Sequence, residues 1–266
     1  MLPVPVQGGG TEIFMLAIER HNKILEILKS EGAAAVSDLS TVLCVTEETV
    51  RRDLEKLEKT GELIRTHGGA VCVDQKLGEL SYTRRIKSYV SEKIRIAKAA
   101  AKCVEPFDTV FIDASTTAYF LAEEIKTVKN LTVITNSLKV ISLLCDTDVR
   151  VVGVGGAVSE NHSFVGSVAE SCIENSLFAN KMFFSAKGFL DGSLILESSG
   201  EECAVKQKMF KNSKSKYFLC DKSKFGKVGH IKLCTASEVD FIITDAHFDE
   251  ACKAKFKKTN TDITEV

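Results

Sequence analysis

The hydrophobic pattern at the amino end of the chain predicts three short helices. From Met15 to Glu31, apolar side chains recur at the spacing of one helical face, and Gly32 ends the run. A second helix is expected from Ser37 to Leu43, and a third from Thr46, a suitable N-cap, to Thr60. Their apolar positions are Ala17, Ile24, Leu28, Val36, Leu39, Val42 or Leu43, Val50, Leu54 and Leu57. Three helices joined by tight turns are typical of a helix-turn-helix, whose last helix can enter a DNA major groove.

Residues 62–73, which follow, predict a β-hairpin with Gly68 and Gly69 at its tip. A helix-turn-helix followed by a hairpin is a winged helix, which we expect over residues 15–73. Residues 1–14, rich in proline and glycine, are expected to form a disordered leader. Residues 74–90 have no clear apolar period and are expected to form a linker.

From Thr109 onward, short apolar runs alternate with helical stretches. Strands are expected over residues 109–113, 131–135, 149–154, 181–186, 216–221 and 239–245. Helices are expected over residues 91–102, 116–126, 137–145, 167–177 and 201–212. Because strands that alternate with helices usually form parallel sheets, residues 91–266 predict an α/β domain with a mostly parallel sheet and helices on both faces.

The charge balance of the first domain counts against DNA binding. The 266 residues carry a formal net charge of −1, and between Met15 and Val73 eight basic residues stand against ten acidic ones. DNA-binding domains usually carry a basic excess, so one interpretation is that Arg51 and Arg52 form a solvated face of a protein-interaction module. The basic residues nevertheless concentrate on the third helix and the hairpin, and residues 76–102 add eight more against two glutamates. Both features favour contact with DNA.

Nine cysteines are scattered along the chain without a Cys-x-x-Cys pair. This spacing argues against a zinc site or a disulfide framework, and it is typical of small buried side chains in a reducing cytosol. No run approaches the roughly 20 apolar residues of a membrane span. We therefore expect a cytoplasmic protein with no metal or other cofactor and no membrane partner.

Polar or glycine residues follow five of the predicted strands at the point where each strand ends. They are Asp113, Ser115, Thr116 and Thr117, then Thr135 and Asn136, then Gly155 and Gly156, then Lys187, and then Lys222. Ligands of open α/β sheets bind beyond the carboxyl ends of the strands, and a helix start offers N–H donors to an anion. Singly, each group is explained by an ordinary cap, turn or surface lysine. Together, without a Gly-rich nucleotide motif, they favour a phosphorylated sugar as ligand.

The third helix and the hairpin also carry a long motif. Thr-Glu-Glu-Thr-Val-Arg-Arg-Asp-Leu-Glu-Lys-Leu-Glu-Lys-Thr-Gly at residues 46–61, followed by Ile-Arg-Thr-His-Gly-Gly-Ala at residues 64–70, resembles the signature of the DeoR family of bacterial transcriptional regulators. The resemblance implies binding to double-stranded operator DNA in the bacterial cytoplasm, on the nucleoid, as a homodimer or homotetramer.

The outward positions of this motif supply candidate DNA contacts. Thr49 and Arg52 are expected to contact base edges, because an arginine that binds guanine through two hydrogen bonds is the commonest specific contact. Arg51, at the edge of that face, and the polar residues of the hairpin are expected to hold phosphates. The full candidate set is Thr46, Thr49, Arg51, Arg52, Lys56, Arg65, His67 and Gly68.

Two polar residues near the predicted core have structural roles instead. Asp53 lies beside the apolar stripe of the third helix, where we expect it to orient an arginine. His21 lies on the stripe of the first helix, where we expect a packed and hydrogen-bonded side chain.

The resemblance continues as far as Asp245. Asp113-x-Ser-Thr-Thr, Thr135-Asn136, Gly155-Gly156, Glu202-x-x-Val-Lys206 and Asp221-x-Ser-Lys-Phe-Gly are similar to the markers of the family's sensor domain. This implies a fold like that of ribose phosphate isomerases and a phosphorylated sugar effector, with Glu202 and Lys206 among its contacts. The family commonly has glycine where this chain has Ser115; a positive φ there would strain a serine, whereas a negative φ would leave an additional hydroxyl donor.

Two other functions compete with that of a sugar-responsive repressor. An aldose–ketose isomerase would use Asp113 or Glu202 as a base, and Lys187 or Lys206 to polarise the carbonyl. Asp113 is expected instead to accept sugar hydroxyls or loop N–H groups, and Glu202 and Lys206 are spaced for an ordinary i,i+4 ion pair. The other competitor is a DNA scaffold with a vestigial sensor. Because an enzyme has no use for a winged helix, we expect a regulator of a sugar-utilisation operon.

Overall fold

The computed structural model describes residues 16–31, 33–60, 62–66, 68–72, 82–248, 253, 256 and 261–266. The chain folds as two compact units, Met1–Leu80 and Ser81–Val266. The predicted leader 1–14, His67 and about half of the predicted linker 74–90 lie outside the described residues. None of the described helices is long and apolar enough to cross a membrane.

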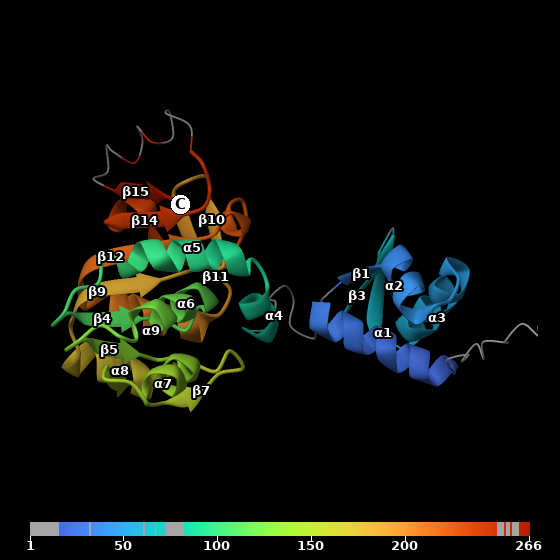
Figure 1. The fold of residues 1–266 in the computed structure, drawn as a ribbon, viewed down its shortest axis with the longest axis horizontal. Coiled ribbons are helices and arrows are strands. Elements are labelled where there is room, and N and C mark those ends of the chain that lie inside the picture. The colour runs from blue at the N-terminus through green and yellow to red at the C-terminus, as the bar shows by residue number, and fades with distance from the viewer. Residues whose placement is uncertain are drawn as a thin grey trace, which may run out of the picture. The chain divides into compact units, whose positions relative to one another are not determined.

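The amino-terminal unit is a winged helix. Its helices are α1 (Ala17–Glu31), α2 (Val36–Leu43) and α3 (Glu47–Lys59). The predicted hairpin is formed by β2 (Leu63–Thr66) and β3 (Gly69–Cys72), and a further strand, β1 (Ala33–Ala35), pairs antiparallel with β3 (Figure 1). The hydrophobic pattern did not predict β1, because three consecutive alanines show no alternation.

Side chains from the three helices and the hairpin form one core: Ile24, Leu28, Val36, Leu39, Leu43, Val50, Leu54, Leu57, Leu63 and Ala70. Beside it the buried carboxylate of Asp53 accepts a hydrogen bond from Arg20 Nε at 2.5 Å and lies 3.0 Å from His21 Nε2. Burial opposes the charge of Asp53, but the bonds from Arg20 and His21 outweigh it and lower the pKa of Asp53. Asp53 thus ties α3 to α1, and the structural roles expected for Asp53 and His21 are confirmed.

Gly69 is required by a close approach inside the small sheet. A Cβ at this position would lie 2.0 Å from the backbone oxygen of Ala34 in β1, whereas a Cβ at Gly68 would meet no atom within 4 Å. The packing of β1 therefore explains Gly69. Gly68 remains open to another molecule.

The second unit is built on a seven-stranded sheet in which every neighbouring pair is parallel. Its strands are β4 (Thr109–Ile112), β5 (Thr132–Thr135), β6 (Arg150–Gly153), β9 (Ala179–Phe184), β12 (Ser213–Cys220), β14 (Phe241–Thr244) and β15 (Asp262–Glu265). They lie in the order β15-β14-β12-β9-β4-β5-β6. The chain adds strands outward from β4 on one side and outward from β9 on the other, so the strand order reverses between β4 and β9.

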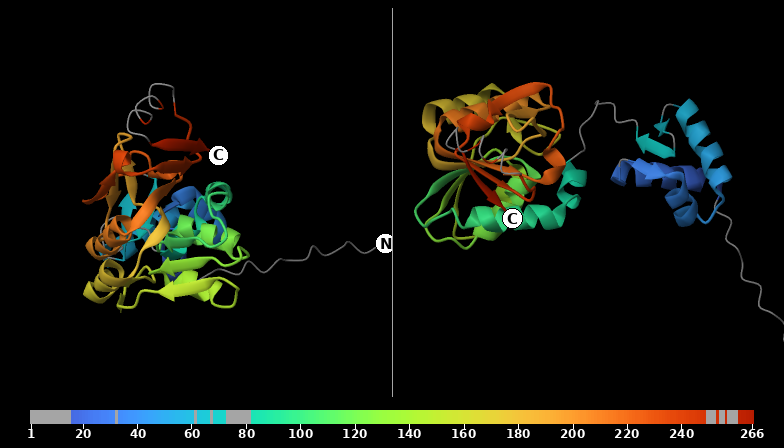
Figure 2. Two further views of the ribbon diagram at one scale, coloured as in Figure 1. Left: turned by 90° about the vertical axis from the view of Figure 1, so that its left-hand side faces the viewer. Right: turned by 90° about the horizontal axis from the view of Figure 1, so that it is seen from above.

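Helices cover both faces of this sheet, as the sequence predicts (Figures 1 and 2). Helices α5 (Val90–Ala101), α6 (Thr116–Ile125) and α7 (Leu138–Leu144) share one core with Val110 and Ile112 of β4. Helices α8 (Ser167–Ser176) and α9 (Gly200–Lys211) share the other core with Phe111. Successive residues of β4 thus point to opposite faces, which makes three layers.

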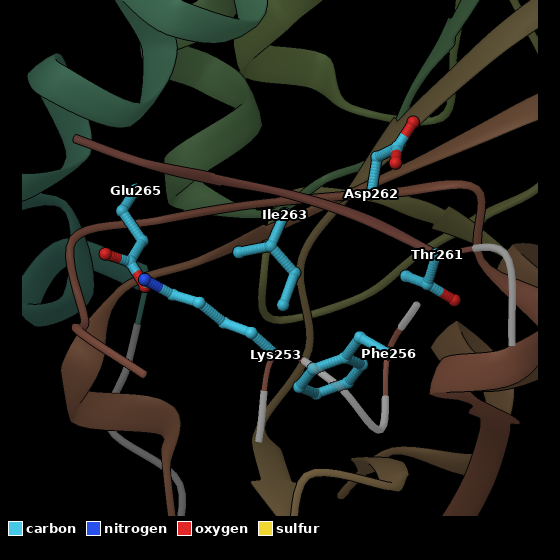
Figure 3. Close-up of a pocket in the computed structure, with 6 residues that line it drawn as sticks. All are labelled: Lys253, Phe256, Thr261, Asp262, Ile263 and Glu265. Carbon is cyan, nitrogen blue, oxygen red and sulfur yellow. The ribbon is translucent and has the colours of Figure 1, made fainter. Parts of the chain in front are cut away.

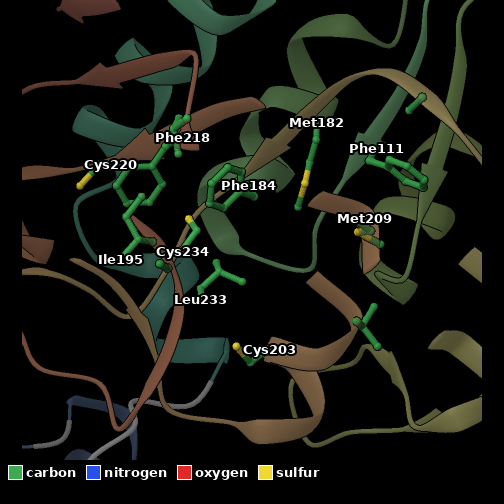
Figure 4. Packing of buried hydrophobic residues seen from close by; sticks show 14 of the residues in the cluster. Phe111, Met182, Phe184, Ile195, Cys203, Met209, Phe218, Cys220, Leu233 and Cys234 are labelled. Atoms are coloured by element: carbon green, nitrogen blue, oxygen red, sulfur yellow. The ribbon is translucent and has the colours of Figure 1, made fainter. Parts of the chain in front are cut away.

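Several short elements have no counterpart in the sequence prediction. They are the sheet of β10 (Gly188–Leu190), β11 (Leu194–Glu197) and β13 (Ile231–Thr235), the pair β7 (Ala157–Val158) and β8 (Phe164–Val165), and the 3₁₀ segments η1 (Lys222–Lys224) and η2 (Ala236–Glu238). Ile195 and Leu233 of the small sheet pack into the same core as Phe184 and Phe218 (Figure 4). Helix α4 (Tyr82–Lys87) lies in the range predicted as linker. The second unit therefore begins earlier than the apolar period indicates.

Candidate functional sites

The start of α3 is organised by two threonines. The hydroxyl of Thr46, the N-cap, accepts a hydrogen bond from the backbone N–H of Thr49 at 3.3 Å. The hydroxyl oxygens of Thr46 and Thr49 lie 2.9 Å apart. The N-cap predicted at Thr46 is confirmed, and both hydroxyls are held at the exposed end of the helix.

Each arginine of the predicted DNA-binding set is paired with a glutamate of α3. Arg51 Nη2 lies 2.6 Å from Glu47, and Arg52 Nε lies 3.2 Å from Glu48. Arg65 Nε, on the hairpin, lies 2.7 Å from Glu58. All three arginine side chains are exposed, and exposed pairs of this kind contribute about 0–1 kcal/mol. A phosphate oxygen can therefore replace the glutamate at small cost.

A groove runs between α3 and the hairpin. Its lining residues are Val36, Arg51, Leu54, Arg65, Thr66, Gly68 and Gly69, around a volume of about 180 Å³. The structure thus brings Arg51, Arg65 and Gly68 of the candidate set together. Arg52 and Lys56 are exposed on α3 but do not line this groove, and His67 lies outside the described residues.

Asp113 directly follows β4, at the point where the strand order reverses. Its Oδ1 accepts hydrogen bonds from the N–H and the hydroxyl of Ser115, at 3.1 and 2.6 Å. Its Oδ2 accepts from the N–H of Ser185, which directly follows β9, at 3.2 Å, and lies 2.9 Å from Lys206 Nζ. Because a carboxylate has about four acceptor positions, Asp113 is saturated within the protein.

Lys206 is also saturated. Besides Asp113, its ammonium donates to Glu197 Oε1 at 2.5 Å and to the backbone oxygen of Ser185 at 2.8 Å. Burial would lower the pKa of Lys206, but the facing carboxylates of Asp113 and Glu197 outweigh it and raise that pKa. An ammonium has three donors, so the described contacts leave none for a ligand. Lys206, predicted as an effector contact, instead holds Asp113 in place.

Glu202 does not form the expected i,i+4 ion pair with Lys206. Its Oε1 accepts hydrogen bonds from the hydroxyls of Ser163, at 2.9 Å, and Ser159, at 3.1 Å. Both serines belong to the loop between β7 and β8. Glu202 therefore holds this loop against α9.

Ser115 adopts a φ of −75° and is the N-cap of α6, where its hydroxyl accepts from the N–H of Ala118 at 3.2 Å. The replacement of the family's glycine thus brings no backbone strain. It adds a hydroxyl that bonds to Asp113. Thr116 and Thr117 occupy the buried first turn of the same helix.

The carboxyl edge of the sheet carries most of the unpaired buried polar atoms. In the described part of the chain, the buried side-chain atoms without a hydrogen-bond partner are Tyr82 Oη, Asn136 Oδ1, Ser185 Oγ, Asp221 Oδ2 and Asp245 Oδ2. The last four residues directly follow β5, β9, β12 and β14. Asp245 Oδ2 has Arg95 at 3.5 Å. Because a buried polar group without a partner costs about 1–3 kcal/mol, each of these atoms calls for a water molecule or a ligand as its partner.

The other predicted effector residues lie around this edge with different environments. Thr135 is buried and accepts from the N–H of Ser137 at 3.0 Å. A Cβ at Gly156, whose φ is +128°, would lie 2.7 Å from the oxygen of Val165, so this glycine is needed for packing. Gly155 is exposed, and the N–H of Lys187 bonds to the oxygen of Leu196.

Lys222 follows Asp221 at the end of β12, and its backbone N–H donates to Asp245 Oδ1 at 2.6 Å. Its exposed ammonium lies 3.9 Å from Glu92, and the residue lines a pocket of about 490 Å³ beside Phe189, Phe225 and Phe248. A smaller pocket of about 300 Å³ adjoins β15, where Lys253 lies 3.2 Å from Glu265 (Figure 3). Of the predicted effector residues, Lys222 alone lines either pocket, within the part of the chain that the structure describes.

Sequence reasoning missed Ser185, Glu197 and Tyr82. Ser185 was placed inside a strand predicted to end at residue 186, whereas β9 ends at Phe184. Glu197 ends β11, a strand too short to show a period. Tyr82 fell within the predicted linker. For Ser185 a usable signal existed, since a serine after an apolar run matches the pattern found at Asp113 and Asn136.

Each of the two units matches the model of a known protein family. The model of the DeoR-like helix-turn-helix domain matches residues 20–76, and that of the DeoR C terminal sensor domain matches residues 88–246. The HTH-type transcriptional regulator YulB of Bacillus subtilis is 38% identical over 95% of this chain and 98% of its own length. The lactose phosphotransferase system repressor of Staphylococcus epidermidis is 35% identical over 85% of this chain and 91% of its own.

Among solved structures, ribose 5-phosphate isomerase A from Methanocaldococcus jannaschii covers 52% of this chain and 55% of its own, with 15% identity and a TM-score of 0.39. The names of the sequence relatives agree with the expectation of a regulator rather than an enzyme. The winged helix, the sensor-domain match and the length of the shared sequence together show that this chain belongs to the DeoR family of transcriptional regulators.

Proposed function

We propose that this protein is an operator-binding repressor of sugar-utilisation genes whose affinity for DNA is set by a phosphorylated sugar. The observation that carries the proposal is the cluster of buried, unpaired polar atoms at the carboxyl edge of the sheet, beside the point where the strand order reverses. Doubly wound sheets bind ligands at such a point. The relative named as a lactose phosphotransferase system repressor supports a link to phosphorylated sugars.

In this proposal α3 enters the major groove of the operator. Thr49 and Arg52 contact base edges, while Arg51 and Arg65, which line one groove, hold phosphates of the backbone. Thr46, Lys56, His67 and Gly68 complete the interface. The exposed pairs of the arginines with Glu47, Glu48 and Glu58 separate when phosphates take the place of the carboxylates.

The phosphorylated sugar binds over the start of α6 and the neighbouring strand ends. The N–H groups of Thr116 and Thr117, in the first turn of α6, receive the anion. Asn136 and Ser185 bond to sugar hydroxyls with the atoms that have no partner in this structure. Asp113 and Lys206 shape the site without touching the ligand, because their hydrogen-bonding capacity is already used.

The regulator acts as a homodimer or homotetramer with two α3 helices in successive major grooves, about 34 Å apart. The sugar phosphate favours an arrangement in which this spacing is lost. It shifts the equilibrium only by the difference between its affinities for the two arrangements. In this proposal, one cytoplasmic protein carries an operator-binding site in its first unit and an effector site in its second unit.

The DNA half is tested by selecting a preferred sequence from random duplexes with the wild-type protein. Arg52→Ala should lower the ratio between the affinity for the preferred duplex and the affinity for a scrambled duplex by about tenfold or more. The reason is that one arginine–guanine contact contributes about 1–3 kcal/mol of discrimination. Lys59→Ala, at the far end of the same helix, is the matched control. Unchanged sequence preference in Arg52→Ala would refute the residue assignment.

The effector half is tested by thermal shift against glucose 6-phosphate, galactose 6-phosphate, fructose 1-phosphate and ribose 5-phosphate, with inorganic phosphate for comparison. A true effector at a hundred times its Kd adds about 2.7 kcal/mol of stability and should release the selected duplex. The same mixtures are assayed for interconversion of aldose and ketose phosphates. Turnover would favour the isomerase, and no response to any sugar phosphate would favour the vestigial sensor.

A further inference from the structure

Helix α4 packs against α6, the helix whose first turn faces the proposed effector site. It also contacts the loop between β7 and β8: the ring of Tyr82 meets the ring of His162 edge-on at 5.9 Å, and Arg85 Nη2 donates to Asn161 Oδ1 at 3.0 Å. That loop holds Glu202 through Ser159 and Ser163. Two elements beside the carboxyl edge of the sheet are therefore bridged by α4.

Tyr82 is an unusual residue on this helix. The side chain is 5% exposed, and its hydroxyl has no hydrogen-bond partner. Burial, together with the nearby Tyr119 and Asp113, raises the pKa of Tyr82, so the hydroxyl keeps its proton and remains a donor. A buried tyrosine hydroxyl usually has a partner, and Asp113 lies close enough to Tyr82 to raise its pKa.

The carboxylates around Lys206 outnumber its positive charge. Asp113, Glu197 and Glu202 act on the ammonium of Lys206, so this part of the edge carries three negative charges against one positive charge. A phosphorylated sugar adds further negative charge. Arg85 supplies a positive charge from α4, and a guanidinium binds phosphate through two parallel hydrogen bonds.

Helix α4 is also fixed at its other end. The buried ammonium of Lys93, on α5, donates to the backbone oxygens of Arg85 and Ser88, the latter at 2.7 Å. Lys93 therefore satisfies carbonyl groups at the carboxyl end of α4. This contact fixes the position from which Tyr82 and Arg85 of α4 contact the loop between β7 and β8.

We infer that α4 is part of the effector site, with the Tyr82 hydroxyl donating to an oxygen of the sugar phosphate and the Arg85 guanidinium binding its phosphate group. The inference rests on the proposed function and extends it to two residues outside the family's motifs quoted above. Helix α4 is the first described element after the winged helix in the chain, so an effector that bonds to it contacts the start of the second unit.

The test compares Tyr82→Phe with the wild type in the full-length protein. Phenylalanine keeps the ring against His162 and removes only the unpaired hydroxyl, so the Tm without ligand should stay equal or rise. The Kd for the most stabilising of the four sugar phosphates should increase about tenfold, as expected for one lost hydrogen bond to a charged group. Tyr119→Phe is the matched control, because Tyr119, on α6, already bonds to Glu123.

Arg85→Met is measured alongside Lys87→Met, which removes an exposed cation from the same helix. We expect Arg85→Met to raise the same Kd about tenfold or more and Lys87→Met to change it less than twofold. A wild-type response that Tyr82→Phe and Arg85→Met leave unchanged would overturn this inference alone. A wild type that responds to none of the sugar phosphates would overturn the proposed effector site and this inference with it. A Tm drop in Tyr82→Phe without ligand would show that the hydroxyl has a protein partner.

Discussion

Lys206 Nζ lies 2.9 Å from Asp113 Oδ2, just beyond the end of β4, although Glu202 stands one helical turn before it on α9. The same ammonium binds Glu197 at 2.5 Å. One buried cation thus joins α9 to the ends of β4 and β11. The loop that opens α6 depends on this pair, because Asp113 orders Ser115 through two hydrogen bonds.

Replacing Lys206 with methionine should destabilise the second unit by about 3–5 kcal/mol, because two buried carboxylates lose their counter-ion. Lys208→Met, on the same helix, removes only a surface pair with Glu174 and should cost less than about 1 kcal/mol. Both are measured by urea unfolding of the full chain. Equal losses in the two variants would show that the buried pair contributes no more than a surface one.

The sequence was sufficient for the architecture. In the winged helix, the hydrophobic period placed α1, α2 and α3 closely, because each has one apolar face, and the N-cap Thr46 marked the start of α3. In the second unit, six of the seven strands of the parallel sheet were predicted, since buried strands are continuous apolar runs. β15 was not predicted, because Asp262–Glu265, at the edge of the sheet, contains a single apolar residue, Ile263.

The site was harder to predict than the fold. The sequence placed Asp113, Thr116 and Asn136 at one edge, because the carboxyl ends of parallel strands lie together. It did not show that Asp113 and Lys206 saturate each other, since their partner Glu197 comes from a strand without a clear pattern. Which polar atoms remain unpaired depends on packing between elements distant in sequence, and no local pattern reports it.

The carboxylate of Asp53 should stabilise the winged helix at neutral pH. Asp53→Asn should cost about 2 kcal/mol there, because Arg20 and His21 lose a charged acceptor. The pKa of Asp53 is lowered in the folded unit, so its contribution is present above the unfolded pKa and is lost as the pH falls through the folded value. Hydrogen exchange of α1 and α3 measures the cost of Asp53→Asn at neutral and at acidic pH. Asp38→Asn, at an exposed position, is the control. A cost that persists undiminished in acid would contradict the pairing.

The arginines of α3 should reveal their roles in the salt dependence of binding to duplex DNA. Arg51→Gln should reduce the slope of log affinity against log salt by about 0.9, the value for one lost phosphate contact. Glu47→Gln should instead raise affinity by a few-fold, because Arg51 no longer has to leave a paired carboxylate and a repelling charge is gone. Lys59→Gln is the control. Fluorescence anisotropy over a salt series measures all three, and an unchanged slope in Arg51→Gln would place Arg51 away from the phosphates.

Lys93 should make the stability of the second unit rise with pH in the alkaline range. Burial lowers the pKa of Lys93 to about 8, and the repelling charges of Lys224 and Arg85 lower it further. The nearby carboxylate of Asp221 acts in the opposite direction but is outweighed. Between that value and the ordinary pKa of 10.5, the unfolded chain binds more protons than the folded one, so the free energy of unfolding increases with pH. Lys93→Met removes this increase. The gap, defined as the free energy of unfolding of the wild type minus that of the variant, should therefore widen from about pH 7 to about pH 9.5. Urea unfolding at the two pH values measures the gap, with Lys98→Met, exposed on the same helix, as the control. A gap that stays constant or narrows would mean that the Lys93 ammonium is not held in a buried site beneath α4.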